Sequence, residues 1–182
     1  MEQALVADMS VEAFYKGWDV ANQAIIDTTG RLTPEQLLLP MGSPPWPVWA
    51  SIAHLAGTRV YWLCLVLKEP GIETTPFRDE SGWEDDLSHP RRADELVEAL
   101  RSTWAIVERC LRTWTPASLA DEVRRERPGG TQLHTRQSIL MRMITHDAYH
   151  SGEVALTLGS HGFTGGGPNG PIDMWAGLSR EA

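Results

Sequence analysis

Two histidines on one predicted helix are the residues best placed to do chemistry. His146 and His150 continue an apolar series that includes Ile139 and Met143, with spacings of four, three and four residues. Residues at i and i+4 share a helix face, so both imidazoles should point into the core and lie close enough to bind one metal ion. A metal ion would satisfy one nitrogen of each buried ring. The spacing also allows a second interpretation, in which these are core histidines bonded to carboxylates or backbone carbonyls.

A third histidine, His54, lies midway along another predicted helix, among small and apolar residues. A single histidine in such a position is more often a core residue with its hydrogen bonds made than a metal ligand. If the two helices pack side by side, however, three inward histidines can meet at one point. Three imidazoles with open positions beside them are typical of reactive zinc sites rather than closed structural ones. The remaining histidines, His89, His134 and His161, fall in predicted connections or at a helix end, where we expect solvated residues.

Other residues are candidates for a pocket beside the histidines. Tyr61 follows His54 by seven residues, two turns along the same helix face, and is a candidate pocket residue. Glu153 follows His150 by three residues and could be a fourth ligand, a base or a surface carboxylate, of which we favour the last. Tyr149 lies off the face of the two histidines, so we expect it to contribute packing.

Two further pairs of side chains extend this list of candidates. Trp46 and Trp49, near the start of the helix that carries His54, could cap the pocket. Arg59 and Arg142 could bind an anionic substrate, although exposed helix arginines without such a role are common.

The fragment from His146 to His150 invites comparison with the zinc protease motif. That motif requires glutamate directly after its first histidine, whereas this chain has Asp147. A side chain one methylene shorter would leave the general base short of a metal-bound water. The sequence therefore disfavours a protease.

Four stretches with helical periodicity must position these residues. They cover about Ser10–Thr29, Pro47–Lys68, Arg92–Trp114 and Thr135–Leu158 or Gly159. The connection Ile72–His89 is polar and could include a short helical turn, and Thr115–His134 is irregular, with no strand pattern longer than a few residues. Within the second connection, we interpret the basic cluster Arg124–Arg127 as a solvated loop or helix end. The sequence therefore predicts an all-α fold, a four-helix bundle with long connections, in a single domain covering residues 1–182.

The composition of the chain disfavours several classes of binding partner and of cellular location. The 182-residue chain has 24 acidic and 16 basic residues and a net charge of −8, which disfavours nucleic acid. Its longest apolar run, Val60–Leu67, is far shorter than the roughly 20 residues of a membrane span. Cys64 and Cys110 both lie in apolar helical surroundings, which favours a reducing compartment. Because Met1–Ala4 also lacks the start of a signal peptide, we expect a cytoplasmic protein.

Several of these segments resemble a known family. The stretch Ile52–Trp62 resembles the second-helix motif of the DinB-like (damage-inducible) superfamily. Thr135–Leu140 and His146–Glu153 are similar to the fourth-helix motif of that family, and Asp173–Trp175 is similar to the way many members end. The resemblance spans nearly the whole chain, although only these segments are specific.

The resemblance implies a four-helix bundle in which His54, His146 and His150 hold a divalent metal ion, often in a homodimer. Related enzymes include thiol-dependent S-transferases and maleylpyruvate isomerases that use low-molecular-weight thiols such as mycothiol or bacillithiol. Many other members have no assigned reaction. Family members often carry glutamine or another polar residue at the position of Glu153, so this chain departs from the pattern there.

These observations lead to one hypothesis and two alternatives. The hypothesis is a metal-dependent transferase, isomerase or hydrolase with one zinc ion, or nickel, and an open position that lowers the pKa of a thiol or water. The resulting nucleophile would attack a small electrophilic molecule, with a low-molecular-weight thiol as a candidate co-substrate. The first alternative is a non-catalytic bundle that binds a metal or a small ligand. The second is a protein whose histidines are merely structural.

Overall fold

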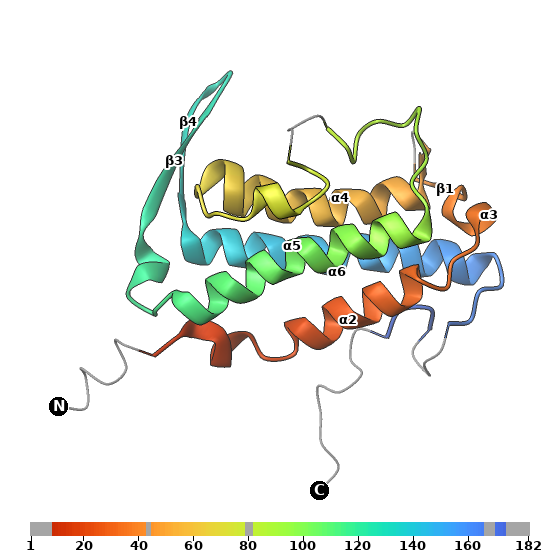
Figure 1. The fold of residues 1–182 in the computed structure, drawn as a ribbon, viewed down its shortest axis with the longest axis horizontal. Helices are drawn as coiled ribbons and strands as arrows, with labels where there is room; N and C mark the ends of the chain where they lie inside the picture. Colours follow the sequence, from red (N-terminus) through yellow and green to blue (C-terminus); the bar gives the residue numbers. More distant parts are fainter. Residues whose placement is uncertain (1–8, 43–44, 79–81, 166–169, 174–182) are drawn as a thin grey trace, which may run out of the picture.

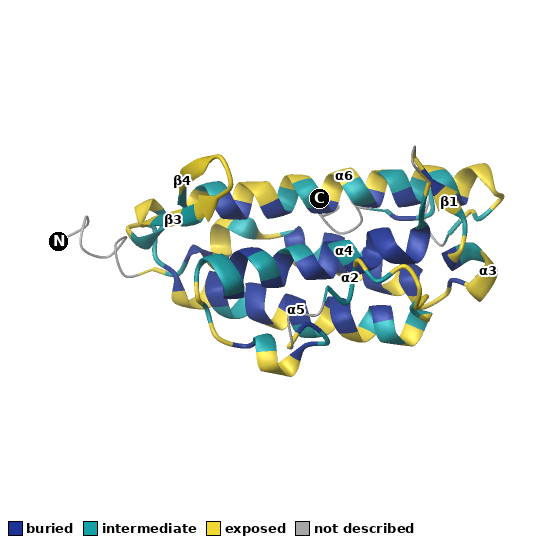
Figure 2. Ribbon diagram, turned by 90° about the horizontal axis from the view of Figure 1, so that it is seen from above, coloured by how far each residue is buried: buried dark blue, intermediate teal, exposed yellow. Residues whose placement is uncertain are grey.

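Long helices dominate the computed structural model, which describes residues 9–42, 45–78, 82–165 and 170–173. The helices that pack side by side are α2 (Trp18–Thr29), α4 (Val48–Val60), α5 (Ala93–Thr113) and α6 (Arg136–Ser160) (Figure 1). The short elements are η1 (Val11–Tyr15), α3 (Pro34–Leu37), β1 (Pro40–Met41), β2 (Trp46–Pro47), η2 (Tyr61–Val66), η3 (Ile72–Thr74) and η4 (Ser118–Ala120). The predicted all-α bundle is confirmed. Figure 2 shows buried residues along the faces where the helices meet.

The first predicted helix, Ser10–Thr29, is interrupted. A 3-10 turn, η1, is followed by Gly17 at a φ of 97°, and only then does α2 begin. A positive φ is readily adopted by glycine alone, so the chain turns here instead of continuing the helix. Phe14, within the range predicted to be helical, is 69% exposed, whereas Val11 and Trp18 are buried.

The helix predicted over Pro47–Lys68 begins and ends close to its predicted limits. Its first part is α4, and its last turn, η2, is a π-helix. Lys68, at a φ of 62°, ends it. Most of α4 is buried because α5 and α6 both pack against it.

The other two long helices, α5 and α6, are also confirmed, and both begin close to the predicted residue. The backbone N–H of Arg92 donates to the Glu95 carboxylate at 2.9 Å at the start of α5. At the start of α6, the Thr135 hydroxyl accepts from the backbone N–H of Ser138 at 3.1 Å. These caps satisfy N–H groups that the first turn of a helix leaves unpaired.

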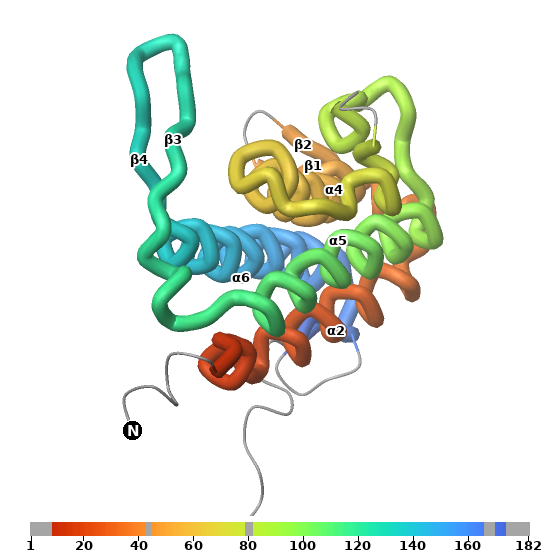
Figure 3. Tube along the Cα trace, turned by 60° about the vertical axis from the view of Figure 1, so that its left-hand side comes forward, coloured from red at the N-terminus to blue at the C-terminus, as the bar shows by residue number. Residues whose placement is uncertain are grey.

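The connection Thr115–His134 is not irregular, which corrects the sequence interpretation. It contains an antiparallel hairpin of β3 (Glu122–Arg127) and β4 (Gly130–Thr135), in which Glu122 pairs with Thr135. The basic cluster is therefore part of a strand, not a loop or helix end. Figures 1 and 3 show the hairpin projecting beyond the helices. The other connection does include a short helical turn, η3, as expected.

The end of the described chain returns to the bundle. The Thr28 hydroxyl donates to the carbonyl of Pro171 at 2.9 Å, and Ile172 is buried. The motif Asp173–Trp175 lies outside the described residues from Met174 onward. Among the described helices, none combines the length and the apolar character that crossing a membrane requires.

Candidate metal centre

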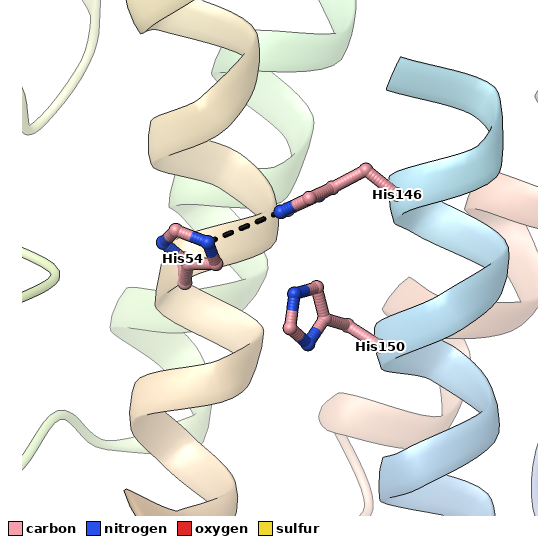
Figure 4. A group of neighbouring side chains, drawn as sticks. All are labelled: His54, His146 and His150. Atoms are coloured by element: carbon pink, nitrogen blue, oxygen red, sulfur yellow. Dashed lines mark hydrogen bonds between the residues drawn. The ribbon is translucent and has the colours of Figure 1, made fainter. Parts of the chain in front are cut away.

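The three predicted histidines converge between α4 and α6. His54 projects from α4, and His146 and His150 project from successive turns of α6 (Figure 4). One potential ligand atom from each residue lies within 4.8 Å of the other two. The Nε2 atoms of His54 and His146 are 3.1 Å apart. All three residues are partly buried at the helix interface.

The surroundings keep two of these imidazoles uncharged. Burial is the main cause that lowers the pKa of His54, and a proton on His150 would lower it further. Burial also lowers the pKa of His146, to about 3, with further contributions from His150 and His54. At neutral pH both rings therefore keep a lone pair, which is the form that binds a metal ion.

Three polar side chains, Ser51, Thr58 and Glu153, contact the cluster, and the Ser51 hydroxyl lies 3.5 Å from His150 Nδ1. His150 Nδ1 lies 2.8 Å from Glu153 Oε2, and His146 Nε2 lies 3.3 Å from the Thr58 hydroxyl. The Glu153 side chain is 38% exposed, and it contacts the cluster at His150. A carboxylate in this position orients the ring and increases its basicity as a ligand. Figure 4 shows the other nitrogen of His150 facing the pair formed by His54 and His146.

The donor set fits a divalent ion such as zinc. Tetrahedral zinc with histidine ligands at roughly 2.0–2.1 Å places the ligand nitrogens about 3.3 Å apart. The observed 3.1 Å between two of the nitrogens is close to that separation. The second nitrogen of His150, Nδ1, is held by Glu153, as in many metal-ligand histidines, whereas His146 Nδ1 is buried without a hydrogen-bond partner among the described residues.

A buried ion pair beside the cluster connects α6 to α4 and α2. Arg59, on α4, is fully buried, and its Nη2 donates to Asp147 Oδ2 at 2.9 Å. The same oxygen accepts from Trp18 Nε1 at 2.9 Å, and Arg59 Nη1 donates to Asn22 Oδ1 at 2.8 Å. The sequence-based idea of an anion-binding Arg59 is therefore wrong. Because Asp147 directly follows His146, this network fixes the rotation of α6.

A cavity of about 400 Å³ opens beside the histidines. Its lining residues come from α4, η2, the 82–91 segment, the hairpin and α6: His54, Gly57, Thr58, Tyr61, Trp62, Glu84, Asp85, Arg125, Arg127, Arg142 and His146. Tyr61 and Arg142, both candidate pocket residues, are among the lining residues. His150 is not among the lining residues. A larger, mostly apolar hollow of about 600 Å³ lies elsewhere and contacts none of the three histidines.

Sequence reasoning missed the two acidic and two of the basic residues of this cavity. Glu84 and Asp85 lie in a connection without periodicity, so nothing in the sequence assigns them a direction. Arg125 and Arg127 belong to the cluster that was interpreted as solvated. The only available signal was the concentration of three arginines in four residues of an acidic chain.

Two aromatic predictions need correction. Trp46 borders the cluster, with its ring centroid 5.4 Å from that of His54, whereas Trp49 belongs to the core and is 1% exposed. Tyr149 is 64% exposed, and its ring packs against that of His150 with the centroids 5.0 Å apart. His134 is not a solvated loop residue, because it lies in β4 with its ring centroid 4.9 Å from that of Trp62.

Comparisons with known proteins agree with this architecture. A solved structure of a DinB-like protein from Bacillus cereus ATCC 10987 superposes with a TM-score of 0.66 at 18% sequence identity. The superposition covers 88% of this chain and 98% of that one, which shows a shared fold. No curated protein matches the chain significantly. The DinB superfamily model, in contrast, matches residues 17–154, a stretch that includes α2 through most of α6. The chain therefore belongs to the DinB superfamily.

Proposed function

We propose that this protein binds one divalent metal ion, zinc or nickel, through His54, His146 and His150 and acts as an enzyme on a small molecule. The observation that supports the proposal is the convergence of three imidazoles, each offering a nitrogen within 4.8 Å of the others. The reaction classes we propose are thiol-dependent S-transfer, isomerisation and hydrolysis. A low-molecular-weight thiol is the proposed co-substrate of the first class.

A bound ion with an open position would supply Lewis acidity and lower the pKa of a thiol or water beside it. The chain contributes the remaining features. His54 and His146 stay neutral because they are buried, and the Glu153 carboxylate accepts the Nδ1 proton of His150. Arg59 and Asp147 hold α6 in position. The adjoining cavity provides space for a substrate, and the Tyr61 ring forms part of its wall. A homodimer in the cytoplasm is part of the same proposal.

The decisive measurement is the metal content of protein purified without a histidine tag. We expect about one zinc or nickel ion per chain by elemental analysis, as in other sites with three histidine ligands. The variants His54→Ala and His146→Ala should each lose the ion and remain helical by circular dichroism. His161→Ala provides the matched control, since His161 is exposed at the end of α6.

Two results would contradict the proposal. One is wild-type protein that remains metal-free after dialysis against zinc. The other is full metal content in either cluster variant. Once the ion is established, zinc-loaded protein should consume an electrophilic haloarene, a maleylpyruvate or an ester, the first two only with added thiol. A loaded protein with none of these activities would be a binding protein rather than an enzyme of these classes.

A further inference from the structure

Arginines are concentrated on one wall of the cavity that adjoins the histidines. Arg125 and Arg127 reach it from β3, and Arg142 reaches it from α6. None of these guanidinium groups forms an ion pair with a described residue, although the chain as a whole carries a net charge of −8. Arg59 and Arg136, in contrast, are each paired with a carboxylate. Unpaired cations beside a cavity point to an anionic ligand.

Two of these groups are held in place by aromatic rings. The guanidinium carbon of Arg125 lies 4.9 Å from the ring centroids of both Tyr61 and Trp62. That of Arg142 lies 5.0 Å from the Trp62 centroid, so one indole holds both cations. Arg125 Nε donates to the Tyr61 hydroxyl at 2.6 Å and Nη1 to Gln132 at 3.3 Å, and Nη2 has no partner among the described residues. The donors are therefore ordered before any ligand binds.

The cavity also contains two carboxylates, which set a limit on the charge of a ligand. Burial is the main cause that raises the pKa of Glu84, which favours its neutral form. Asp85 is exposed. On the arginine side, burial and then the charges of Arg142 and Arg125 lower the pKa of His134. Three arginines and two carboxylates line the cavity, so its lining suits an anion of low charge.

We propose that Arg125 and Arg142 bind a carboxylate group of the substrate and direct the rest of the molecule toward His54 and His146. This inference rests on the proposed function, since it names the substrate class of the same site. A carboxylate matches the planar fork of a guanidinium group. The cavity of about 400 Å³ is of a size that encloses a small molecule. The net charge of −8 disfavours a nucleic acid as the ligand.

The test uses metal-free full-length protein, so that a carboxylate cannot bind through a metal ion. Isothermal titration calorimetry with a series of small mono- and dicarboxylates should detect binding by at least one member, and its neutral amide should not bind. Arg125→Gln and Arg142→Gln should each weaken that binding about 10- to 100-fold, the expected loss of one charge-assisted hydrogen bond. Arg124→Gln is the matched control, since Arg124 is exposed on the same strand and does not line the cavity.

Three outcomes would overturn the inference. They are an absence of binding across the whole series, equal weakening in Arg124→Gln, and binding of inorganic phosphate with no carboxylate binding. The measurement is independent of the metal content described above. A protein that binds zinc but no carboxylate would contradict only this inference, and one that binds a carboxylate but no zinc would contradict only the metal proposal.

Discussion

Neutral imidazoles at the cluster make the metal-free protein sensitive to acid. The unfolded chain binds a proton at a histidine with a pKa of about 6.5. In the folded protein burial lowers the pKa of His146 to about 3 and also lowers that of His54. The unfolded state therefore binds more protons below pH 6.5 or so, and the free energy of unfolding should fall as the pH falls from there.

We expect metal-free protein to lose stability as the pH falls from about 6.5 to about 3, and to keep a nearly constant contribution from these groups above that range. Urea unfolding in the presence of a chelator measures the effect. His146→Ala lacks one of the two groups, so its stability should depend less steeply on pH. A wild-type profile with the same slope as the variant would refute the assignment of the acid sensitivity to His146.

At the scale of residues, the sequence predicts the histidines well and their surroundings poorly. His146 and His150 share a helix face because of their spacing, and His54 joins them because adjacent helices pack. The interaction of Arg125 with Tyr61 joins positions 64 residues apart, and it depends on a hairpin that the periodicity does not reveal. Glu84 approaches Gly57 so closely that a Cβ there would lie 2.6 Å from the carboxylate. No spacing rule predicts such a contact.

At the scale of elements, the ion pair of Arg59 and Asp147 joins α4 to α6 in the core. Both side chains are almost fully buried, so removal of one partner leaves the other charge uncompensated. Arg59→Met should therefore reduce the free energy of unfolding by about 3–5 kcal/mol, measured by urea denaturation. It should also weaken metal binding, because Asp147 adjoins His146.

Arg101→Met is the matched control for this variant. Arg101 is exposed on α5, and its replacement should change stability by no more than about 0.5 kcal/mol. The double variant Arg59→Met, Asp147→Leu should recover part of the loss because it removes both charges. Equal effects of Arg59→Met and Arg101→Met would show that the pair does not stabilise the packing of α4 against α6.

The long helices were predictable because each carries an apolar seam, and in α6 Ile139 and Met143 are buried whereas His146 and His150 are partly buried. Two features of the fold were not predictable in this way. The break at Gly17 depends on a single backbone angle within an otherwise continuous seam. The hairpin carries polar or charged side chains on both faces, so it lacks the alternation that indicates a half-buried strand. Contacts with Tyr61 and Trp62, distant in sequence, stabilise it instead.

At the scale of the whole molecule, the two buried cysteines report on global unfolding. Cys64 and Cys110 are free thiols, and burial raises their pKa values to about 11 and about 12. A protonated, buried thiol is unreactive, so an aromatic disulfide reagent should label them only when the protein opens. Protein loaded with zinc and freed of excess metal should be labelled more slowly, by up to about a thousandfold, since a bound ligand stabilises the folded state.

His54→Ala supplies the control for this experiment. It keeps both cysteines in the same surroundings and lacks one proposed ligand, so exposure to zinc should leave its labelling rate unchanged. Rapid labelling of the native wild-type protein would mean that the thiols are accessible without unfolding. Equal slowing by zinc in the variant would assign the effect to a different metal site.

The hairpin of β3 and β4 has a consequence for how copies of the protein meet. Its strands hydrogen-bond to each other as a two-stranded sheet, so each has an outer edge that an extended strand from another molecule could join. Long charged side chains oppose such pairing, and β3 reads Glu-Val-Arg-Arg-Glu-Arg. Arg125 and Arg127 at the cavity thus belong to a strand whose charge also disfavours aggregation, and mutations that neutralise them should weaken ligand binding and promote aggregation together.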